Sequence, residues 1–210
     1  MICFDCETAA LPDSTLESLK PQFRPAANLK DPEKIKASIA EQEAKWRDRA
    51  ALDAKTARIL AIGTLDEGGT NQALCGDNEA GILEAFWDLW ASGEKFVGFA
   101  CHHFDAPLVW QRSIILNVRP PQDFMSGRYL SPRIIDLQSV WTCGSRDIAG
   151  QSLDAVCRAC GLGGKTGNGA DFGALWLSDR PAALEYLATD LELTWKLAER
   201  LGVIKAMPPF

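Results

Sequence analysis

The sequence lacks any long apolar segment. Of its 210 residues 47% are hydrophobic, yet no uninterrupted apolar run approaches the roughly 18–20 residues that a membrane-spanning helix needs. The apolar residues are spread along the whole chain, and a chain of this length can bury one full core. We therefore expect a single domain over residues 1–210 and no association with a membrane.

Histidine and net positive charge are scarce as well. The only histidines are His102 and His103, so Cys157 and Cys160 lack the second ligand pair that a zinc site of this kind requires.

Lysine and arginine total 22 against 28 aspartates and glutamates, which gives a net charge of −6. This balance argues weakly against a general basic surface for nucleic acid. It is compatible with a nuclease whose carboxylates hold divalent cations.

The N-terminus lacks the features of a signal peptide. An acidic residue, Asp5, falls where a basic segment and then an apolar segment would be required. Without an export signal, the seven cysteines are expected to be free thiols in a reducing compartment. We therefore expect a cytoplasmic protein.

Alternation of apolar and polar residues, together with turn residues, predicts five strands. The first, at residues 2–7, places Phe4 and Cys6 on one face and Asp5 and Glu7 on the other. The remaining strands are expected at 58–65, 72–75, 95–99 and 133–135. Helices are expected at 79–91, 106–116, 136–141, 151–160, 170–177 and 181–201. This order indicates an α/β fold, with a mixed sheet flanked by helices.

Residues 24–55 are expected to form a helical insertion after the first strand. Asp31 supplies a helix cap, Pro32 suits the first turn and Glu33 is an early acid. We interpret the insertion as a cover on the domain rather than as part of its core. Its helix could act as a lid on a substrate groove or be a solvated surface helix, and the residues leave both interpretations open.

Asp5 and Glu7 are the first candidates for a functional site. They stand two apart on a strand, so both side chains point the same way. Neighbouring carboxylates raise each other's pKa unless a positive charge lies between them, and a divalent cation with oxygen ligands supplies that charge. The alternative is an exposed strand face at the edge of a sheet.

Asp105 and Asp190 are further candidates, each with a structural alternative. Asp105 precedes Ala106 and Pro107, so it is placed as a helix N-cap, a role compatible with one oxygen facing a metal. In the last helix, Asp190 is the only charge on the buried side, with Tyr186 one turn before it. A buried carboxylate needs a metal or a partner, so a buried salt bridge is the alternative.

Together these residues form an ordered set along the chain. It consists of Phe4-Asp5-Cys6-Glu7-Thr8, Val97-Gly98-Phe99 with Phe104-Asp105, and Tyr186-Leu-Ala-Thr-Asp190. The set resembles the DEDD superfamily of DnaQ-like 3′–5′ exonucleases, in the DEDDy branch that uses tyrosine. It is most similar to predicted free-standing exonucleases related to the proofreading domain of family B DNA polymerases. Segments Ile135-Asp136-Leu137 and Ser152-Leu153-Asp154 are also similar to that group.

The resemblance implies a ribonuclease H-like fold with a five-stranded mixed sheet and a site for two Mg²⁺ or Mn²⁺ ions. The implied metal ligands and catalytic carboxylates are Asp5, Glu7, Asp105 and Asp190. Tyr186 would orient the attacking water. Substrate contacts are expected from Thr8, Phe104 and Lys165, and other candidates for phosphate contacts are Arg112, Arg128 and Arg133.

The implied activity is the removal of nucleotides from the 3′ end of DNA. Single-stranded DNA is the favoured substrate, and a polymerase or replication protein is a candidate partner. Two alternatives remain, an exoribonuclease with the same site and a non-catalytic nucleic-acid-binding module. One residue departs from the family pattern, because Cys101 stands where asparagine is common. The departure bears on substrate alignment more than on catalysis.

Overall fold

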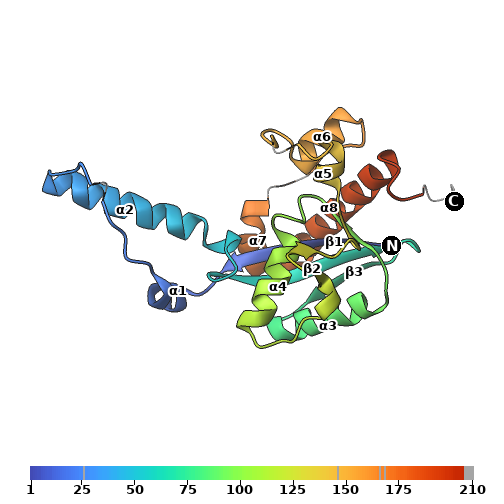
Figure 1. Ribbon diagram of the computed structural model, residues 1–210, viewed down its shortest axis with the longest axis horizontal. Coiled ribbons are helices and arrows are strands. Elements are labelled where there is room, and N and C mark those ends of the chain that lie inside the picture. The colour runs from blue at the N-terminus through green and yellow to red at the C-terminus, as the bar shows by residue number, and fades with distance from the viewer. Residues whose placement is uncertain (26, 146, 166, 168, 206–210) are drawn as a thin grey trace.

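A five-stranded mixed sheet forms the centre of the molecule (Figure 1). The structure is a computed structural model that describes residues 1–25, 27–145, 147–165, 167 and 169–205. The strands, in their order across the sheet, are β3 (Asn71–Cys75), β2 (Ala57–Asp66), β1 (Ile2–Ala10), β4 (Phe96–Gly98) and β7 (Ile134–Asp136). Strand β2 is antiparallel to both of its neighbours, β3 and β1, whereas β1, β4 and β7 are parallel. All five strands were predicted, with ends that differ by a few residues.

Strand β1 lies in the middle of the sheet. It pairs with β2 on one side and with β4 on the other. Asp5 and Glu7 therefore belong to a central strand, and the interpretation of these acids as an exposed sheet edge is wrong.

Helices cover both faces of the sheet, so that each face has its own apolar core (Figure 1). On the face that receives Phe4 and Cys6 of β1 lie α3 (Glu79–Ala91) and α4 (Asp105–Ile115). On the other face lie α5 (Leu137–Trp141), α6 (Leu153–Ala159), α7 (Phe172–Ser178) and α8 (Arg180–Arg200). The alternation along β1 correctly predicted this division. The architecture is α/β and ribonuclease H-like.

The insertion after β1 is an arm that projects from the sheet (Figure 1). It comprises α1 (Asp13–Leu19), α2 (Pro32–Asp48) and the 3₁₀ helix η1 (Ala50–Leu52). Helix α2 begins as predicted, because the Asp31 carboxylate accepts a hydrogen bond from the Glu33 N–H at 2.9 Å. None of its residues is buried. The expectation that the insertion covers the domain is therefore wrong for α2.

Several short elements were not predicted. They are α1, the small hairpin of β5 (Met125–Ser126) and β6 (Tyr129–Leu130), and the 3₁₀ helix η2 (Gln122–Phe124). Each has too few residues to establish a periodic pattern. The helix predicted at 170–177 corresponds to the 3₁₀ helix η3 (Gly169–Asp171) followed by α7. In the part of the chain that the structure describes, no helix is long and apolar enough to span a membrane.

Gly63 allows α8 to approach the sheet closely. It lies on β2 opposite Asp5 of β1. A Cβ atom at this position would come within 2.8 Å of Leu187 Cγ and 2.8 Å of Leu191 Cδ1, both on α8. Since α8 also carries Asp190, this close approach helps to bring Asp190 towards β1.

We expect Gly63→Ala to destabilise the protein, because the added methyl group overpacks the contact between β2 and α8. The free energy of unfolding should fall by about 1–3 kcal/mol, as measured by urea denaturation. Gly76→Ala is the matched control, since nothing lies within 4 Å of its Cβ position. Equal stabilities of Gly63→Ala and the wild type would contradict this account of the packing.

Candidate active site

Three carboxylates from two elements converge at the centre of the sheet. One oxygen each from Asp5, Glu7 and Asp190 lies within 4.8 Å of the others. Asp5 and Glu7 share one face of β1, and Asp190 reaches them from α8, where it is only 1% exposed. Strand alternation and helical periodicity thus bring together acids that are far apart in the sequence.

The Asp190 carboxylate is only partly satisfied. Its Oδ2 atom accepts a hydrogen bond from Lys165 Nζ at 2.5 Å. Its Oδ1 atom is buried and has no hydrogen-bond partner among the described residues. The buried salt bridge considered as an alternative is therefore present, but it satisfies one oxygen of two. A buried oxygen left without a partner costs free energy, and a cation shared with Asp5 and Glu7 would remove that cost.

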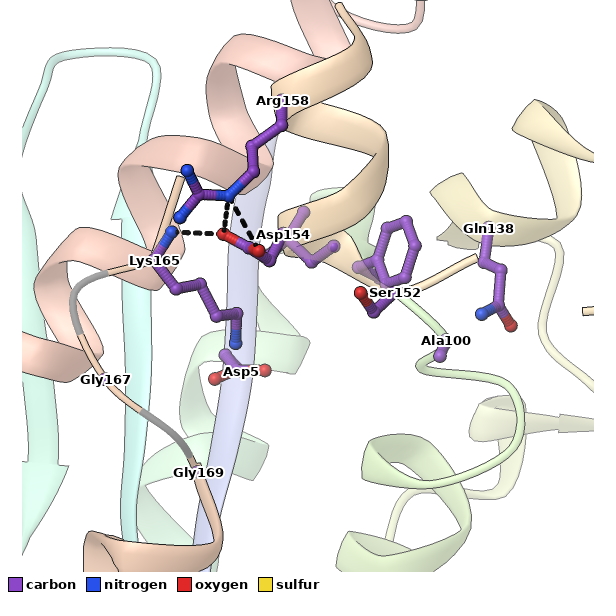
Figure 2. A pocket seen from close by; sticks show the side chains of 11 residues that line it. Asp5, Ala100, Gln138, Ser152, Asp154, Arg158, Lys165, Gly167 and Gly169 are labelled. Carbon is purple, nitrogen blue, oxygen red and sulfur yellow. Dashed lines mark hydrogen bonds and ion pairs between the residues drawn. The ribbon is translucent and has the colours of Figure 1, made fainter. Parts of the chain in front are cut away.

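Lys165 is the cation nearest to this cluster. Its side chain extends from the loop after α6 towards Asp5 (Figure 2). Besides the contact with Asp190, its Nζ lies 3.4 Å from the Tyr186 hydroxyl. Burial lowers the pKa of Lys165, but the charge and hydrogen bond of Asp190, together with the charge of Asp5, leave that pKa above its usual value. The side chain therefore stays charged beside the carboxylates.

Tyr186 packs under the same loop. Its ring lies 6.2 Å from that of Phe172, and a Cβ at Gly167 would come within 3.2 Å of it. Burial raises the pKa of Tyr186 above its usual value, so the phenol remains protonated at neutral pH. Its hydroxyl group can consequently both donate and accept a hydrogen bond at the edge of the cluster.

Asp105, the first residue of α4, lies beside β1. Its Oδ1 accepts a hydrogen bond from the Cys6 N–H at 2.9 Å. The N-cap of α4 is Phe104, without a side-chain capping bond, so the interpretation of Asp105 as the N-cap is wrong. Burial raises its pKa to about 6. Asp105 is thus anchored beside the strand that carries Asp5 and Glu7.

Burial and the neighbouring negative charges both raise the pKa values of the clustered acids. Burial, followed by the charges of Asp5 and Asp190, raises the pKa of Glu7 to about 9. Burial and then Asp105 and Asp190 raise the pKa of Asp5 well above its usual range. Lys165 lowers both pKa values but does not cancel the effect. Such a set gains most from divalent cations, which favour charged carboxylates.

A pocket of about 710 Å³ opens beside the cluster (Figure 2). Its lining residues are Asp5, Phe99, Ala100, Gln138, Ser152, Leu153, Asp154, Arg158, Lys165, Gly167 and Gly169. None of them comes from the arm. A pocket of this size is in the range of small-molecule sites.

Asp154 fixes the loop that carries Lys165. Its Oδ1 accepts the Lys165 backbone N–H at 2.7 Å, and its oxygens accept Arg158 Nε at 2.8 and 3.0 Å (Figure 2). The sequence showed Asp154 only as part of a similar segment. The pocket residues Phe99, Ala100, Gln138 and Arg158 were not predicted as site residues, because their roles depend on tertiary contacts.

The other predicted substrate residues lie away from the pocket lining. Thr8 Oγ1 donates to the Ala51 carbonyl at 2.7 Å, and Phe104 packs against the core on the α3 and α4 face. Arg112 is buried and donates two hydrogen bonds of 2.7 Å to Glu79. Arg112 therefore has a structural role in the core.

Two further arginines and Cys101 also lie outside the lining. Arg133 packs over the Trp90 ring at 3.8 Å, and Arg128 contacts the neighbouring Tyr129. Cys101 is buried, with Sγ 3.6 Å from the Ile135 carbonyl. The departure at position 101 thus changes a buried contact rather than a residue that lines the pocket.

Comparisons with known proteins agree with this geometry. Among solved structures, the fold is similar to the family B DNA polymerase from the hyperthermophilic archaeon Pyrobaculum calidifontis, with a TM-score of 0.64 and 17% sequence identity. The similarity covers 95% of this chain and 24% of the polymerase, so the chain spans about a quarter of that protein's length. No curated protein sequence matches the chain.

A family model matches residues 49–207, which include Asp105, Lys165, Tyr186 and Asp190 but not β1. The model describes a predicted 3′–5′ exonuclease related to the exonuclease domain of PolB. The match covers most of the chain, and the fold and the carboxylate cluster are compatible with it. The chain belongs to this family of predicted 3′–5′ exonucleases.

Proposed function

We propose that the protein removes nucleotides from the 3′ end of single-stranded DNA in a metal-dependent reaction. The observation that carries the proposal is the cluster of Asp5, Glu7 and Asp190 beside an open pocket, with Asp190 Oδ1 buried and unsatisfied. A structural ion pair alone would not leave that oxygen without a partner. The family of the chain adds the expectation of exonuclease chemistry.

The donor set suits hard divalent cations. Mg²⁺ and Mn²⁺ prefer carboxylate oxygens, and Asp5, Glu7 and Asp190 offer them together. Asp105 Oδ1 accepts the Cys6 N–H, which leaves its other oxygen as a further donor. That oxygen and Asp5 would hold a second ion. Two such ions, when bound, would supply an activated water and stabilise the charge that develops on the leaving 3′ oxygen.

Residues around the cluster would orient the substrate and the water. The protonated Tyr186 hydroxyl would hold the attacking water by a hydrogen bond. Lys165, which donates to Asp190, would contact a phosphate oxygen. Thr8 and Phe104 remain proposed substrate contacts on the strength of the resemblance, although neither lines the pocket.

The cellular setting is also a proposal. The seven cysteines are free thiols, which suits a reducing compartment such as the cytoplasm. The resemblance to a polymerase exonuclease domain leads us to propose a polymerase or another replication protein as a partner.

The decisive assay offers 5′-labelled single-stranded DNA, duplex DNA and RNA with Mg²⁺, Mn²⁺ or a chelator. We expect a ladder that shortens from the 3′ end of single-stranded DNA with either metal, and no cleavage in chelator. Cleavage of RNA alone would identify an exoribonuclease instead. Binding without cleavage of any substrate would favour the non-catalytic module.

Asp5→Asn and Asp190→Asn should each abolish this activity, because each removes a negative charge from the proposed metal site at almost unchanged shape. We expect a loss of at least about 100-fold in kcat, with the fold intact by circular dichroism. Glu185→Gln is the control, since Glu185 is exposed on α8 beside Tyr186 and should be dispensable. Wild-type rates in either aspartate variant would refute the assignment.

The raised pKa of Glu7 predicts a stability that depends on pH and metal. Between its usual 4.5 and about 9, the folded metal-free protein binds more protons than the unfolded chain. Its free energy of unfolding should therefore fall as pH rises through this window. Glu7→Gln cannot ionise, so in chelator at pH 8 it should be more stable than the wild type, by on the order of a few kcal/mol.

Thermal unfolding from pH 5 to pH 9, with chelator or with Mn²⁺, checks this prediction. The stability difference should shrink towards pH 5, where Glu7 is protonated in the folded wild type. Mn²⁺ should raise the unfolding temperature of the wild type at pH 8 more than that of Glu7→Gln. A variant less stable than the wild type in chelator at pH 8 would contradict the repulsion described here.

A further inference from the structure

Asp136, at the end of β7, is a buried carboxylate outside the pocket lining. It is 2% exposed, and it accepts four backbone hydrogen bonds. Two come from the first turn of α5, where Gln138 N–H donates to Oδ1 at 2.8 Å and Ser139 N–H at 3.3 Å. These two bonds make Asp136 the N-cap of α5.

The other two bonds reach a segment more than thirty residues earlier in the chain. Ala100 N–H donates to Oδ1 at 3.0 Å across 36 residues, and His102 N–H donates to Oδ2 at 3.0 Å across 34. The parallel pairing of Gly98 with Asp136 sets this register. A helix cap requires neither bond, so Asp136 also ties the segment between β4 and α4 to the end of β7.

The tied segment includes a residue with a strained backbone. Ala100 has a φ of 58°, in the left-handed region that costs a residue with a Cβ roughly 1–2 kcal/mol. Such a conformation persists only where the surroundings enforce it. Ala100 also lines the pocket, as does Gln138 on the other side of Asp136, so one carboxylate holds two parts of the pocket wall.

The same segment leads directly to Asp105. The Ala100 carbonyl accepts from His103 N–H at 3.0 Å and from Phe104 N–H at 3.3 Å, and the Cys101 carbonyl accepts from Ala106 N–H at 3.0 Å. These bonds form the turn from which α4 begins. The position of the Asp105 carboxylate against Cys6 therefore depends on the turn that Asp136 holds.

We infer that Asp136 is a positioning residue for the proposed reaction. It fixes the strained turn at 100–104 and, through it, the pocket wall at Ala100 and the carboxylate of Asp105. Asp136 is not one of the three clustered carboxylates, and all four hydrogen bonds that it accepts come from backbone N–H groups. The inference rests on the proposed function for its catalytic consequence, but its structural part can be tested without it.

Asp136→Asn separates the two roles. An amide oxygen in the place of Oδ1 keeps the bonds from Ala100, Gln138 and Ser139. The amide NH₂ then faces the His102 N–H, so two donors meet and that bond is lost. Asp136→Ala loses all four bonds and serves as the more severe member of the series.

In hydrogen exchange, Asp136→Asn should speed exchange of the amides in 100–105 while the first turn of α5 keeps its protection. With labelled single-stranded DNA, kcat should fall about 10- to 100-fold, the usual effect of losing a residue that orients metal ligands. KM for DNA should change much less, because Asp105 acts on the transition state. Asp136→Ala should show a larger loss in both measurements.

Glu79→Gln is the matched control, since Glu79 is a partly buried carboxylate that also accepts structural hydrogen bonds. It accepts from Arg112 at 2.7 Å and from Ile59 N–H at 2.9 Å. We expect it to lower the free energy of unfolding while kcat and exchange at 100–105 stay at wild-type values.

Two outcomes would overturn the inference. One is unchanged exchange at 100–105 in Asp136→Asn. The other is a loss of kcat in Glu79→Gln equal to that in Asp136→Asn. A wild type that cleaves no nucleic acid would refute the proposed function alone, and the exchange data would still decide whether Asp136 holds the turn.

Discussion

The repulsion among buried carboxylates is the constraint on which the rest of the site depends. Asp5 and Glu7 share one face of a central strand, and Asp190 meets them from α8. Packing forces them together, as the close approach at Gly63 shows. Lys165 offsets part of the negative charge, yet one Asp190 oxygen stays unsatisfied. Holding these acids at a separation that suits divalent cations thus lowers the stability of the metal-free fold.

Local periodicity was sufficient to predict which acids turn inward. Alternation along β1 placed Asp5 and Glu7 on one face, and helical spacing placed Asp190 on the buried side of α8. The five strands and the helix start at Asp31 followed from the same reasoning. These features depend on neighbours within one or two turns, so the residues alone determine them.

Contacts between distant segments could not be predicted in the same way. The sequence predicts Asp105 as a helix cap, whereas its carboxylate accepts a hydrogen bond from the Cys6 N–H, 99 residues away along the chain. Asp136 and Asp154 organise the pocket through backbone groups that only strand register and loop closure bring near. Helix α1 has seven residues and is tied by Glu17 to Arg47 of α2 at 2.6 Å. Leu16 of the same helix is buried, and neither contact can be read from so short a sequence pattern.

The way in which the arm joins the sheet bears on how far its sequence can vary. The arm leaves β1 after Ala10 and returns at Ala57, and these two residues are paired neighbours in the antiparallel ladder. Topologically, the whole insertion occupies the place of a hairpin turn. Helix α2 buries no residue, so its length and sequence can vary while the strand that bears Asp5 and Glu7 keeps its register. Ala50 and Ala54, which are buried where the arm returns to the sheet, are more tightly constrained.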